Sequence, residues 1–225
     1  MQIIPVIDLK DGQVVHAVRG DRANYQAIHR HSILTPSSEP HDVLASFLAL
    51  HPFKKFYIAD LNAIAGTGDH YPLILSLAQA HPEIEFWLDN GSQLSVTNND
   101  QANLKRVIGT ESQRSPPDNS NQDFILSLDF KDQRPAGLAD WFSQSQFWPN
   151  TIIAMTLNRV GSNNGPDFEK LIDLKQHHPE KHLVAAGGVR DAGDLSKLKT
   201  IGIYAALLAT ALHSGAISKQ DIQNL

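Results

Sequence analysis

Two aspartates, Asp8 and Asp129, occupy nearly identical short sequences in the two halves of the chain. The first lies in Ile-Asp-Leu-Lys-Asp-Gly and the second in Leu-Asp-Phe-Lys-Asp-Gln, and each aspartate ends a run of apolar residues. A single aspartate at a strand end usually accepts backbone N–H groups and shapes a loop. Two related aspartates on opposite sides of a substrate suit an isomerisation, in which one group removes a proton and another supplies one. We therefore predict that Asp8 and Asp129 are catalytic.

The composition restricts the kinds of protein that this chain can form. It has 225 residues, 41% of them apolar, which suits one compact domain spanning 1–225. The absence of cysteine excludes disulfides and thiolate metal sites, and the eleven histidines lack the spacing of a zinc site. A net charge of −5 without a basic stripe argues against nucleic acid, and no apolar run reaches the roughly 20 residues of a membrane span. The apolar N-terminal run lacks the basic flank of a signal peptide, so we expect a cytoplasmic protein.

Short apolar runs recur along the chain and predict buried strands. Most lack the two-residue alternation of a half-exposed strand, which is typical of a parallel sheet covered on both faces. The eight runs are residues 3–8, 54–60, 84–89, 105–109, 124–129, 151–157, 182–186 and 203–208. Helical patterns lie between several of them, at 41–50, 71–80, 167–177 and 192–199, and Asp167 and Asp191 are suitable N-terminal caps. Eight alternations of strand and helix predict an α/β fold, a single (β/α)8 or TIM barrel.

Two connections depart from this pattern. Residues 111–123 contain two prolines in a polar cluster, so we expect a loop there and a shortened or missing fourth helix. Residues 13–40 are longer than a simple connection from strand to helix. In that segment we expect a small hairpin that pairs Val14-Val15 with Ala17-Val18.

The two halves of the chain can be superimposed in sequence. Asp60-Leu61-Asn62 matches Thr156-Leu157-Asn158, Asp89-Asn90-Gly91 matches Ala186-Gly187-Gly188, and Ile108-Gly109-Thr110 matches Leu208-Ala209-Thr210. With the two aspartate segments these are four matches in the same order, each at a predicted strand end. Coincidence among apolar runs is the alternative explanation. We interpret the matches as half-repeats of about 1–112 and 123–225, which form a barrel from two half-barrels.

Glycines after the predicted seventh strand indicate a phosphate site. Gly187 and Gly188 precede a predicted helix, where backbone N–H groups can approach an anion and the helix dipole favours it. Thr210 after the eighth strand adds a hydroxyl, and phosphate sites of such barrels commonly lie on these two loops. A tight turn that needs glycine is the alternative. The symmetry-related phosphate-binding candidates, beside which Asp89 would repel a phosphate, are Gly91, Gly109 and Thr110.

The sequence resembles the ProFAR isomerase/imidazole-glycerol-phosphate synthase family of histidine biosynthesis, whose members are half-repeat (β/α)8 barrels. The resemblance covers essentially the whole chain and rests on segments at 3–21, 106–112, 125–132, 159–167, 185–195 and 206–215. It implies that Asp8 and Asp129 are the general base and general acid of an Amadori rearrangement, the isomerisation of an aminoaldose to an aminoketose. The substrate of the isomerase carries a phosphate at each end, and each half-barrel holds one.

Several positions depart from the pattern of the isomerase. Asp89-Asn90-Gly91 stands where the isomerase has a glycine triplet, Val160 replaces a loop carboxylate, and Ala209 replaces a glycine after the last strand. The resemblance therefore implies an intact acid/base pair, a partly kept phosphate site in the second half and a damaged one in the first half.

A closer resemblance concerns the long first connection. The segment from Gly20 to Ile28, with Ser32 and Ser37-Ser38-Glu39-Pro40, is similar to divergent members of the family. These occur in methanogenic archaea and in methylotrophic bacteria that make tetrahydromethanopterin or methanofuran. The substrate-contact candidates are Lys10, Arg19, Arg22, Tyr25, Thr156 and Arg159.

Three functions remain open at this point. The first is a histidine-biosynthesis-type isomerase, or a related lyase, that acts on a phosphorylated sugar or ribonucleotide-like substrate without a metal or an organic cofactor. The second is such an enzyme in tetrahydromethanopterin or methanofuran biosynthesis, within one-carbon metabolism. The third is a barrel that binds a phosphorylated ligand without turnover. We expect a monomer or a homodimer, with neither nucleic acid nor a membrane as a partner.

Overall fold

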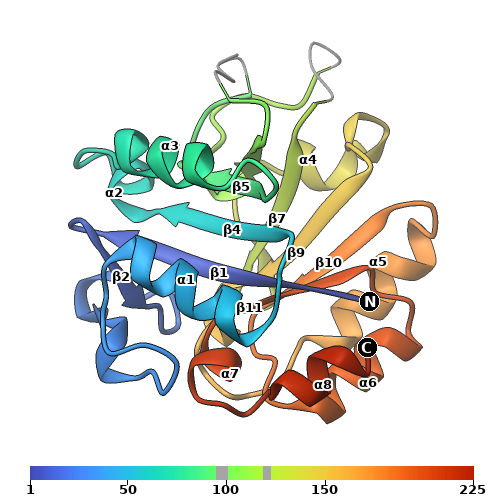
Figure 1. Cartoon of the computed structure of the whole chain (residues 1–225). Coiled ribbons are helices and arrows are strands. Elements are labelled where there is room, and N and C mark those ends of the chain that lie inside the picture. The colour runs from blue at the N-terminus through green and yellow to red at the C-terminus, as the bar shows by residue number, and fades with distance from the viewer. Residues whose placement is uncertain (95–100, 119–122) are drawn as a thin grey trace.

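A closed barrel of eight parallel strands forms the centre of the molecule (Figure 1). The computed structural model describes residues 1–94, 101–118 and 123–225. Each barrel strand pairs in parallel with the next, and the last pairs with the first. The barrel strands are β1 (Gln2–Lys10), β4 (Lys55–Asp60), β5 (Glu85–Asp89), β6 (Leu104–Gly109), β7 (Ile125–Lys131), β9 (Thr151–Thr156), β10 (His182–Ala186) and β11 (Ala205–Leu208). The predicted TIM barrel is confirmed.

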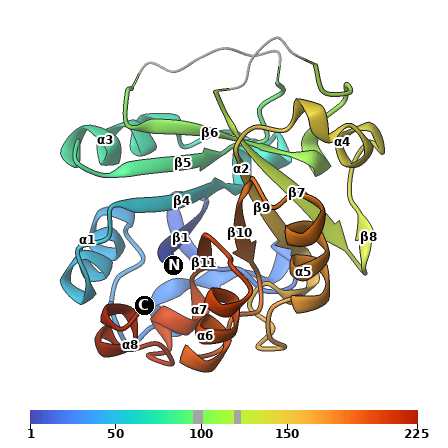
Figure 2. The ribbon, with the colours of Figure 1, turned by 90° about the vertical axis from the view of Figure 1, so that its right-hand side faces the viewer.

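Helices cover the outside of the barrel, and two short ones lie at its mouth, directly after the ends of strands (Figure 2). They are α1 (Pro40–Leu50), α2 (Leu61–Ala65), α3 (Tyr71–Ala80), α4 (Asp140–Ser143), α5 (Phe168–His177), α6 (Ala192–Thr200), α7 (Thr210–His213) and α8 (Lys219–Gln223). The four helices predicted from hydrophobic spacing are α1, α3, α5 and α6. Asp167 and Asp191 cap α5 and α6 as predicted, because their side chains accept hydrogen bonds from the N–H groups of Lys170 and Asp194. Among the helices of the described ranges, none is long and apolar enough to cross a membrane.

The alternation of strand and helix is less regular than the sequence predicts. Between β6 and β7 the described residues contain one turn of 3-10 helix, η3 (Thr110–Ser112), followed by residues 113–118 without helix or strand; residues 119–122 of the predicted loop lie outside the described residues. Between β5 and β6 the described residues contain no helix, which the sequence did not indicate. The remaining 3-10 turns are η1 (Arg22–Asn24), η2 (Ile28–Arg30), η4 (Ser145–Phe147) and η5 (Leu157–Arg159).

The hairpin predicted within residues 13–40 is wrong in its pairing. Strand β2 (Gln13–His16) turns back on β1, with Val14 opposite Leu9, and pairs on its other side with β3 (Gln26–Ala27). Asp11 and Gly12 connect β1 to β2 with positive φ angles of 50° and 80°. Two consecutive residues with positive φ make the tight turn that suits the twist of a hairpin. The turn at Asp11-Gly12 therefore sets the pairing, and residues 17 and 18 lie in no strand.

A second turn of the same kind follows β7. Asp132 and Gln133 have positive φ angles of 49° and 66°, and β8 (Arg134–Pro135) pairs antiparallel with the end of β7. The two aspartate segments thus share a backbone course as well as a sequence. This likeness agrees with the half-repeat at about 1–112 and 123–225, which stays a prediction.

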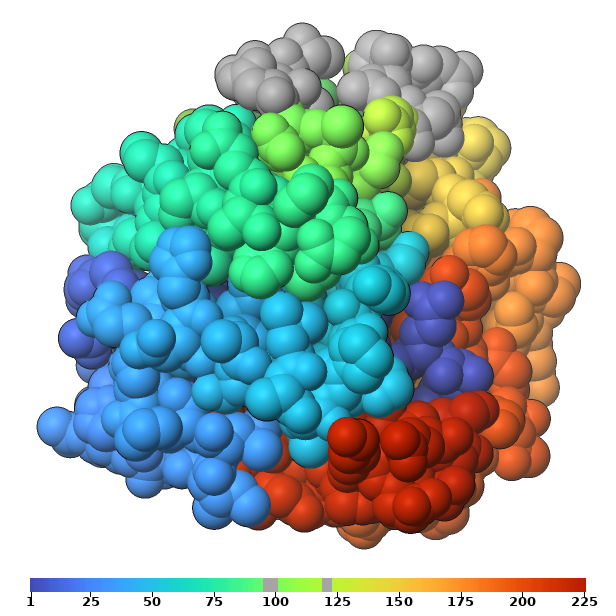
Figure 3. Space-filling view, viewed as in Figure 1, coloured from blue at the N-terminus to red at the C-terminus, as the bar shows by residue number. Residues whose placement is uncertain are grey.

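The core has two layers that follow from the alternation of side chains along each strand. One layer fills the barrel and includes Ile4, Trp87, Val107, Ile153 and Val184, all of them buried. The other lies between the strands and the helices. Figure 3 shows α1 and α3 side by side over one side of the barrel, with the C-terminal segment below them. Polar side chains that share the inward face are therefore held at the ends of the barrel.

Candidate active site

Three aspartates on alternate barrel strands point into the mouth of the barrel. Asp8 lies near the end of β1, Asp89 at the end of β5 and Asp129 in β7. Ala59 of β4 pairs with both Asp8 and Asp89 in the strand register, so these two lie at the same level. All three aspartates line one cavity together with Glu111. Alternate strands of such a barrel contribute one layer of side chains, and here carboxylates make up most of that layer.

The two predicted catalytic aspartates are held differently. Asp129 is 4% exposed, and its Oδ1 accepts a hydrogen bond from the Ser127 hydroxyl at 2.7 Å. Its Oδ2 accepts one from the Glu111 N–H at 3.0 Å and lies 3.4 Å from the Thr110 hydroxyl. Asp8 is 9% exposed, and its carboxylate accepts no hydrogen bond within the described part of the chain. Asp129 is therefore fixed in orientation, whereas Asp8 presents an uncommitted carboxylate to the cavity.

Burial raises the pKa of both carboxyl groups into the neutral range. The pKa of Asp8 rises to about 7 because burial disfavours its charge, although the nearby Arg22 guanidinium lowers it. The pKa of Asp129 rises to about 8 because burial outweighs the hydrogen bond from the Glu111 N–H, and the charge of Asp89 adds to the rise. Either group can gain or lose a proton near neutral pH, which general acid/base catalysis requires.

Asp89 is a cavity residue that the sequence identified only as an obstacle to phosphate. Its Oδ2 accepts a hydrogen bond from the Tyr57 hydroxyl at 2.8 Å, and its Oδ1 accepts one from the Gly91 N–H at 3.2 Å. Burial raises the pKa of Asp89, and these two hydrogen bonds lower it. Its position at the end of an alternate strand, like those of Asp8 and Asp129, is the signal that could have placed it in the site.

The long first connection contributes one cation and one tyrosine to the cavity. Arg22 and Tyr25, predicted substrate contacts, both line it. The Nη2 of Arg22 lies 2.6 Å from the Oε1 of Glu111, so an ion pair joins this connection to the loop after β6. The Nζ of Lys10 donates to the Arg22 carbonyl at 2.8 Å and fixes the connection from the β1 side. Burial, followed by the charge of Asp8, raises the pKa of Tyr25 to about 12.

The opposite side of the cavity is formed by glycine-rich backbone. Gly187, Gly188 and Thr210 line it, as predicted, after β10 and β11. The two glycines have φ angles of 98° and 87°. A β-carbon on Gly188 would lie 2.3 Å from the Gly165 carbonyl oxygen, so close packing against the loop after β9 also requires glycine here. Successive backbone N–H groups in such a turn form a concavity that suits an anion.

The sequence as a whole matches one protein family. A sequence profile described as "Histidine biosynthesis protein" matches residues 2–218. The chain belongs to the histidine biosynthesis protein family. An uncharacterized protein of Methanocaldococcus jannaschii is 29% identical, over 100% of this chain and 98% of its own. The phosphoribosyl imidazole-4-carboxamide isomerase (ProFAR isomerase) of Listeria welshimeri is 24% identical over 99% of this chain and 97% of its own. The isomerase of the same name from Acinetobacter baylyi is 27% identical over 100% of this chain and 98% of its own.

The first-half phosphate candidates lie outside the cavity lining. Gly109 faces carboxylates, because a β-carbon there would lie 3.1 Å from the Oδ2 of Asp129 and 3.6 Å from that of Asp89. Thr110 is fully buried, and its hydroxyl accepts a hydrogen bond from the Asp129 N–H at 2.9 Å. Gly91 donates its N–H to Asp89. These residues surround two carboxylates, which disfavours a phosphate there, and the phosphate site that symmetry suggested stays a prediction.

Four of the predicted substrate contacts also lie outside the cavity lining. Arg19, whose φ angle is 53°, lines a neighbouring depression instead. The Lys10 ammonium group donates a hydrogen bond to the Arg22 carbonyl. Thr156 is 2% exposed and lies behind Gly187. Arg159 donates to the carbonyls of Gly165 and Pro166 at 2.9 and 3.1 Å, so it shapes the loop after β9. Within the described residues, no group of three or more His, Asp or Glu side chains is arranged to hold a metal ion.

Proposed function

We propose that the protein is an isomerase of the ProFAR isomerase type, which converts a phosphorylated aminoaldose into the aminoketose. The observation that carries the proposal is the presence of Asp8 and Asp129 in one buried cavity, with pKa values of about 7 and about 8. The whole-length similarity to proteins named as ProFAR isomerases supports the same reaction class.

The two aspartates have distinct roles in this proposal. Asp129, in its protonated form, gives its proton to the ring oxygen as the sugar ring opens, and the nitrogen lone pair forms a carbon–nitrogen double bond. Asp8, in its ionised form, removes the proton from the neighbouring carbon to give an enolamine, which tautomerises to the ketose. The Asp8 carboxylate accepts no hydrogen bond among the described residues, whereas Asp129 is held by Ser127 and the Glu111 N–H, and this difference favours Asp8 as the base. The Ser127 hydroxyl, 2.7 Å from Asp129, can rotate so that it accepts a hydrogen bond from the protonated Asp129 carboxyl group.

The glycine side of the cavity is the proposed phosphate site. Gly187 and Gly188 offer a turn with consecutive positive φ angles, and Thr210 adds a hydroxyl that lies 3.2 Å from the Nε2 of His16. A phosphate there would orient the substrate between the two aspartates. Effective orientation accounts for much of the rate enhancement of an enzyme that uses no covalent intermediate.

Conservative substitution of each aspartate tests the proposal. Asp8→Asn and Asp129→Asn should each lower kcat for ProFAR by about a thousandfold, because the amide can neither take up nor release the proton. Asp132→Asn is the matched control, since Asp132 is exposed in the turn that follows Asp129. The assay is paired with complementation of a strain that lacks the isomerase. Full activity of the Asp8→Asn variant would contradict the acid/base assignment.

A second candidate function is the same rearrangement on a different phosphorylated substrate, as in tetrahydromethanopterin or methanofuran biosynthesis. The carboxylates of Asp89 and Glu111 favour it, because they line the cavity where a second phosphate would have to lie. If the wild-type protein neither converts ProFAR nor complements the strain, this candidate replaces the first. If the barrel only binds its ligand, the wild-type protein should catalyse no reaction, and the Asp8→Asn variant should bind the ligand as tightly as the wild type does.

A further inference from the structure

We infer that the substrate carries a protonated amine, and no second phosphate, at the end that lies between the loops after β5 and β6. This inference rests on the second candidate of the proposed function, the same rearrangement on a phosphorylated substrate other than ProFAR, in which Gly187 and Gly188 hold one phosphate. It concerns the other end of the same cavity, which is lined by Asp89, Glu111 and Arg22.

The carboxylate of Asp89 has acceptor capacity that no cation uses. Its two hydrogen bonds come from the uncharged Tyr57 hydroxyl and Gly91 N–H, at 2.8 and 3.2 Å. No ion pair of Asp89 occurs among the described residues. Each oxygen of an ionised carboxylate can accept a further hydrogen bond, and charge-assisted bonds from an ammonium group are the strongest of these.

The cavity contains too little positive charge to receive a second phosphate. Arg22 is the one basic side chain among the described residues that line it, and its guanidinium is already paired with Glu111 at 2.6 Å. A phosphate would have to take Arg22 away from Glu111 and would then lie beside the carboxylates of Glu111 and Asp89. Repulsion between the phosphate and these two carboxylates would disfavour binding strongly.

Asp8 provides an independent indication of a cationic ligand. It is nine-tenths buried, it lines the same cavity, and its carboxylate has no hydrogen-bond partner within the described ranges. An ammonium group in the cavity would favour the ionised form of Asp8, which is the form that the proposed base requires. Binding of the amine would therefore prepare the base for catalysis. Burial raises the pKa of Asp89 as well, so the same cation would favour its ionised form.

Gly109 keeps this acidic region open. A β-carbon there would stand between the Oδ2 atoms of Asp129 and Asp89, at 3.1 and 3.6 Å. No side chain therefore separates the two carboxyl groups, and a small donor group can approach Asp89 beside the protonated Asp129.

Three flexible ligands test the inference on the full chain by isothermal titration calorimetry. Aminopentyl phosphate carries the phosphate and the amine, pentyl phosphate lacks the amine, and pentane bisphosphate replaces the amine by a second phosphate. We expect aminopentyl phosphate to bind about tenfold more tightly than pentyl phosphate, the effect of one partly buried charge pair. Pentane bisphosphate should bind no more tightly than pentyl phosphate.

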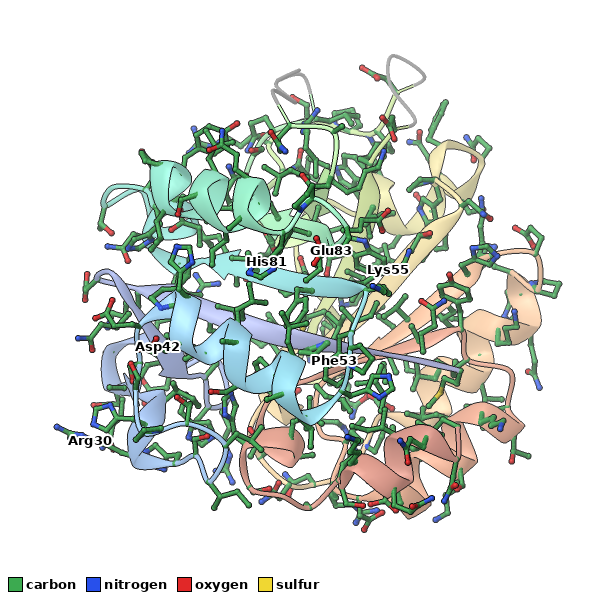
Figure 4. The ribbon with its side chains drawn as sticks, viewed as in Figure 1. Arg30, Asp42, Phe53, Lys55, His81 and Glu83 are labelled. Carbon is green, nitrogen blue, oxygen red and sulfur yellow. The ribbon has the colours of Figure 1, made fainter. Side chains whose placement is uncertain are left out.

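Two variants locate the preference for the amine. Asp89→Asn and Glu111→Gln should each reduce the tenfold preference by at least about half, while the affinity for pentyl phosphate stays within about twofold. Glu83→Gln is the matched control: Glu83 is an exposed carboxylate beside His81, just before β5 begins and away from the carboxyl ends of the strands (Figure 4). It should leave all three affinities unchanged.

The outcomes separate this inference from the proposed function. Tightest binding of pentane bisphosphate, or a preference for the amine that persists in both variants, would overturn the cationic end alone. Pentyl phosphate that binds equally well to a Gly188→Ala variant would overturn the phosphate site of the proposed function. If none of the three ligands binds to the wild-type protein, both are overturned.

Discussion

The loops after β5 and β10 are equivalent in the predicted half-repeat, yet they offer a ligand opposite charges. Asp89-Asn90-Gly91 places a buried carboxylate in the cavity, covered by the Tyr57 hydroxyl at 2.8 Å. Ala186-Gly187-Gly188 places backbone with positive φ angles there, without a charged side chain. The same strand end can therefore support an anion site or a cation site, depending on whether its first residue is aspartate or alanine and its second residue is asparagine or glycine.

The loops that follow β6 and β11 extend this contrast. After β11, Thr210 presents its hydroxyl to the cavity beside His16. After β6, the equivalent Thr110 is fully buried and bonds to Asp129, while Glu111 reaches the cavity and pairs with Arg22. The side of the mouth that follows β10 and β11 is thus uncharged and offers N–H and O–H donors. The side that follows β5 and β6 offers carboxylate acceptors. A substrate that is asymmetric in charge fits such a mouth.

The largest expected difference is between two glycine-to-alanine variants, one in the loop after β10 and one in the loop after β5. Gly188→Ala forces a β-carbon to 2.3 Å from the Gly165 carbonyl oxygen at a φ of 87°. We expect it to lower the free energy of unfolding by about 3 kcal/mol and to abolish binding of pentyl phosphate. Gly91→Ala, with its β-carbon 3.1 Å from the Ile64 Cα, should cost about 1 kcal/mol and leave that binding intact. Calorimetry measures the binding of pentyl phosphate, and chemical denaturation measures the free energy of unfolding. If both variants lose binding equally, the two loops do not differ in their role as predicted.

A second effect follows from the proton that Asp129 holds in the folded state. Its pKa is about 8 when folded against 3.8 as the ordinary value, so the folded protein binds the proton more tightly than the unfolded chain does. The contribution of Asp129 to stability is therefore fully present below about pH 4 and is lost as the pH rises toward about 8. Asp129→Asn removes this loss, so its free energy of unfolding should rise relative to that of the wild type by about 4 kcal/mol as the pH goes from about 5 to about 9. Chemical denaturation at both pH values measures this change. The Asp132→Asn control should differ from the wild type by the same free energy of unfolding at each pH. If the difference between Asp129→Asn and the wild type is also the same at both pH values, Asp129 is ionised throughout.

The smallest effect concerns the ion pair across the acidic side. The side chains of Arg22 and Glu111 are 38% and 31% exposed, so solvent screens their attraction. Arg22→Gln should change the free energy of unfolding by no more than about 0.5 kcal/mol. The same variant should raise the pKa of Asp8, because Arg22 lowers it in the wild type. The acid limb of the pH–rate profile would then move to higher pH, and an unmoved limb would separate Arg22 from the base.

The fold could be predicted almost completely from the sequence because buried parallel strands leave continuous apolar runs. The four helices with clear hydrophobic spacing were found, and Asp167 and Asp191 cap two of them as expected. The pairing of β2 was missed because two adjacent apolar pairs suggested a hairpin, whereas the positive φ angles at Asp11 and Gly12 direct β2 back to β1.

The candidate site could be predicted where a residue ends a barrel strand and less well elsewhere. Asp8, Asp129, Gly187 and Gly188 line the cavity because the strand register places them there. Symmetry did not indicate that the Thr110 hydroxyl bonds to Asp129. In the long connection, sequence alone could not separate residues only three positions apart. Arg22 reaches the cavity from η1, whereas the Arg19 N–H donates to the Val160 carbonyl and its side chain lies in the neighbouring depression.

A crystal structure determined in inorganic phosphate tests the central contrast most directly. We expect one phosphate at the mouth of the barrel, bound by the backbone of Gly187 and Gly188 and by the Thr210 hydroxyl, with the Arg22–Glu111 ion pair intact. A phosphate bound between Arg22 and Gly91, with Glu111 displaced, would contradict it and restore a substrate that carries a phosphate at each end.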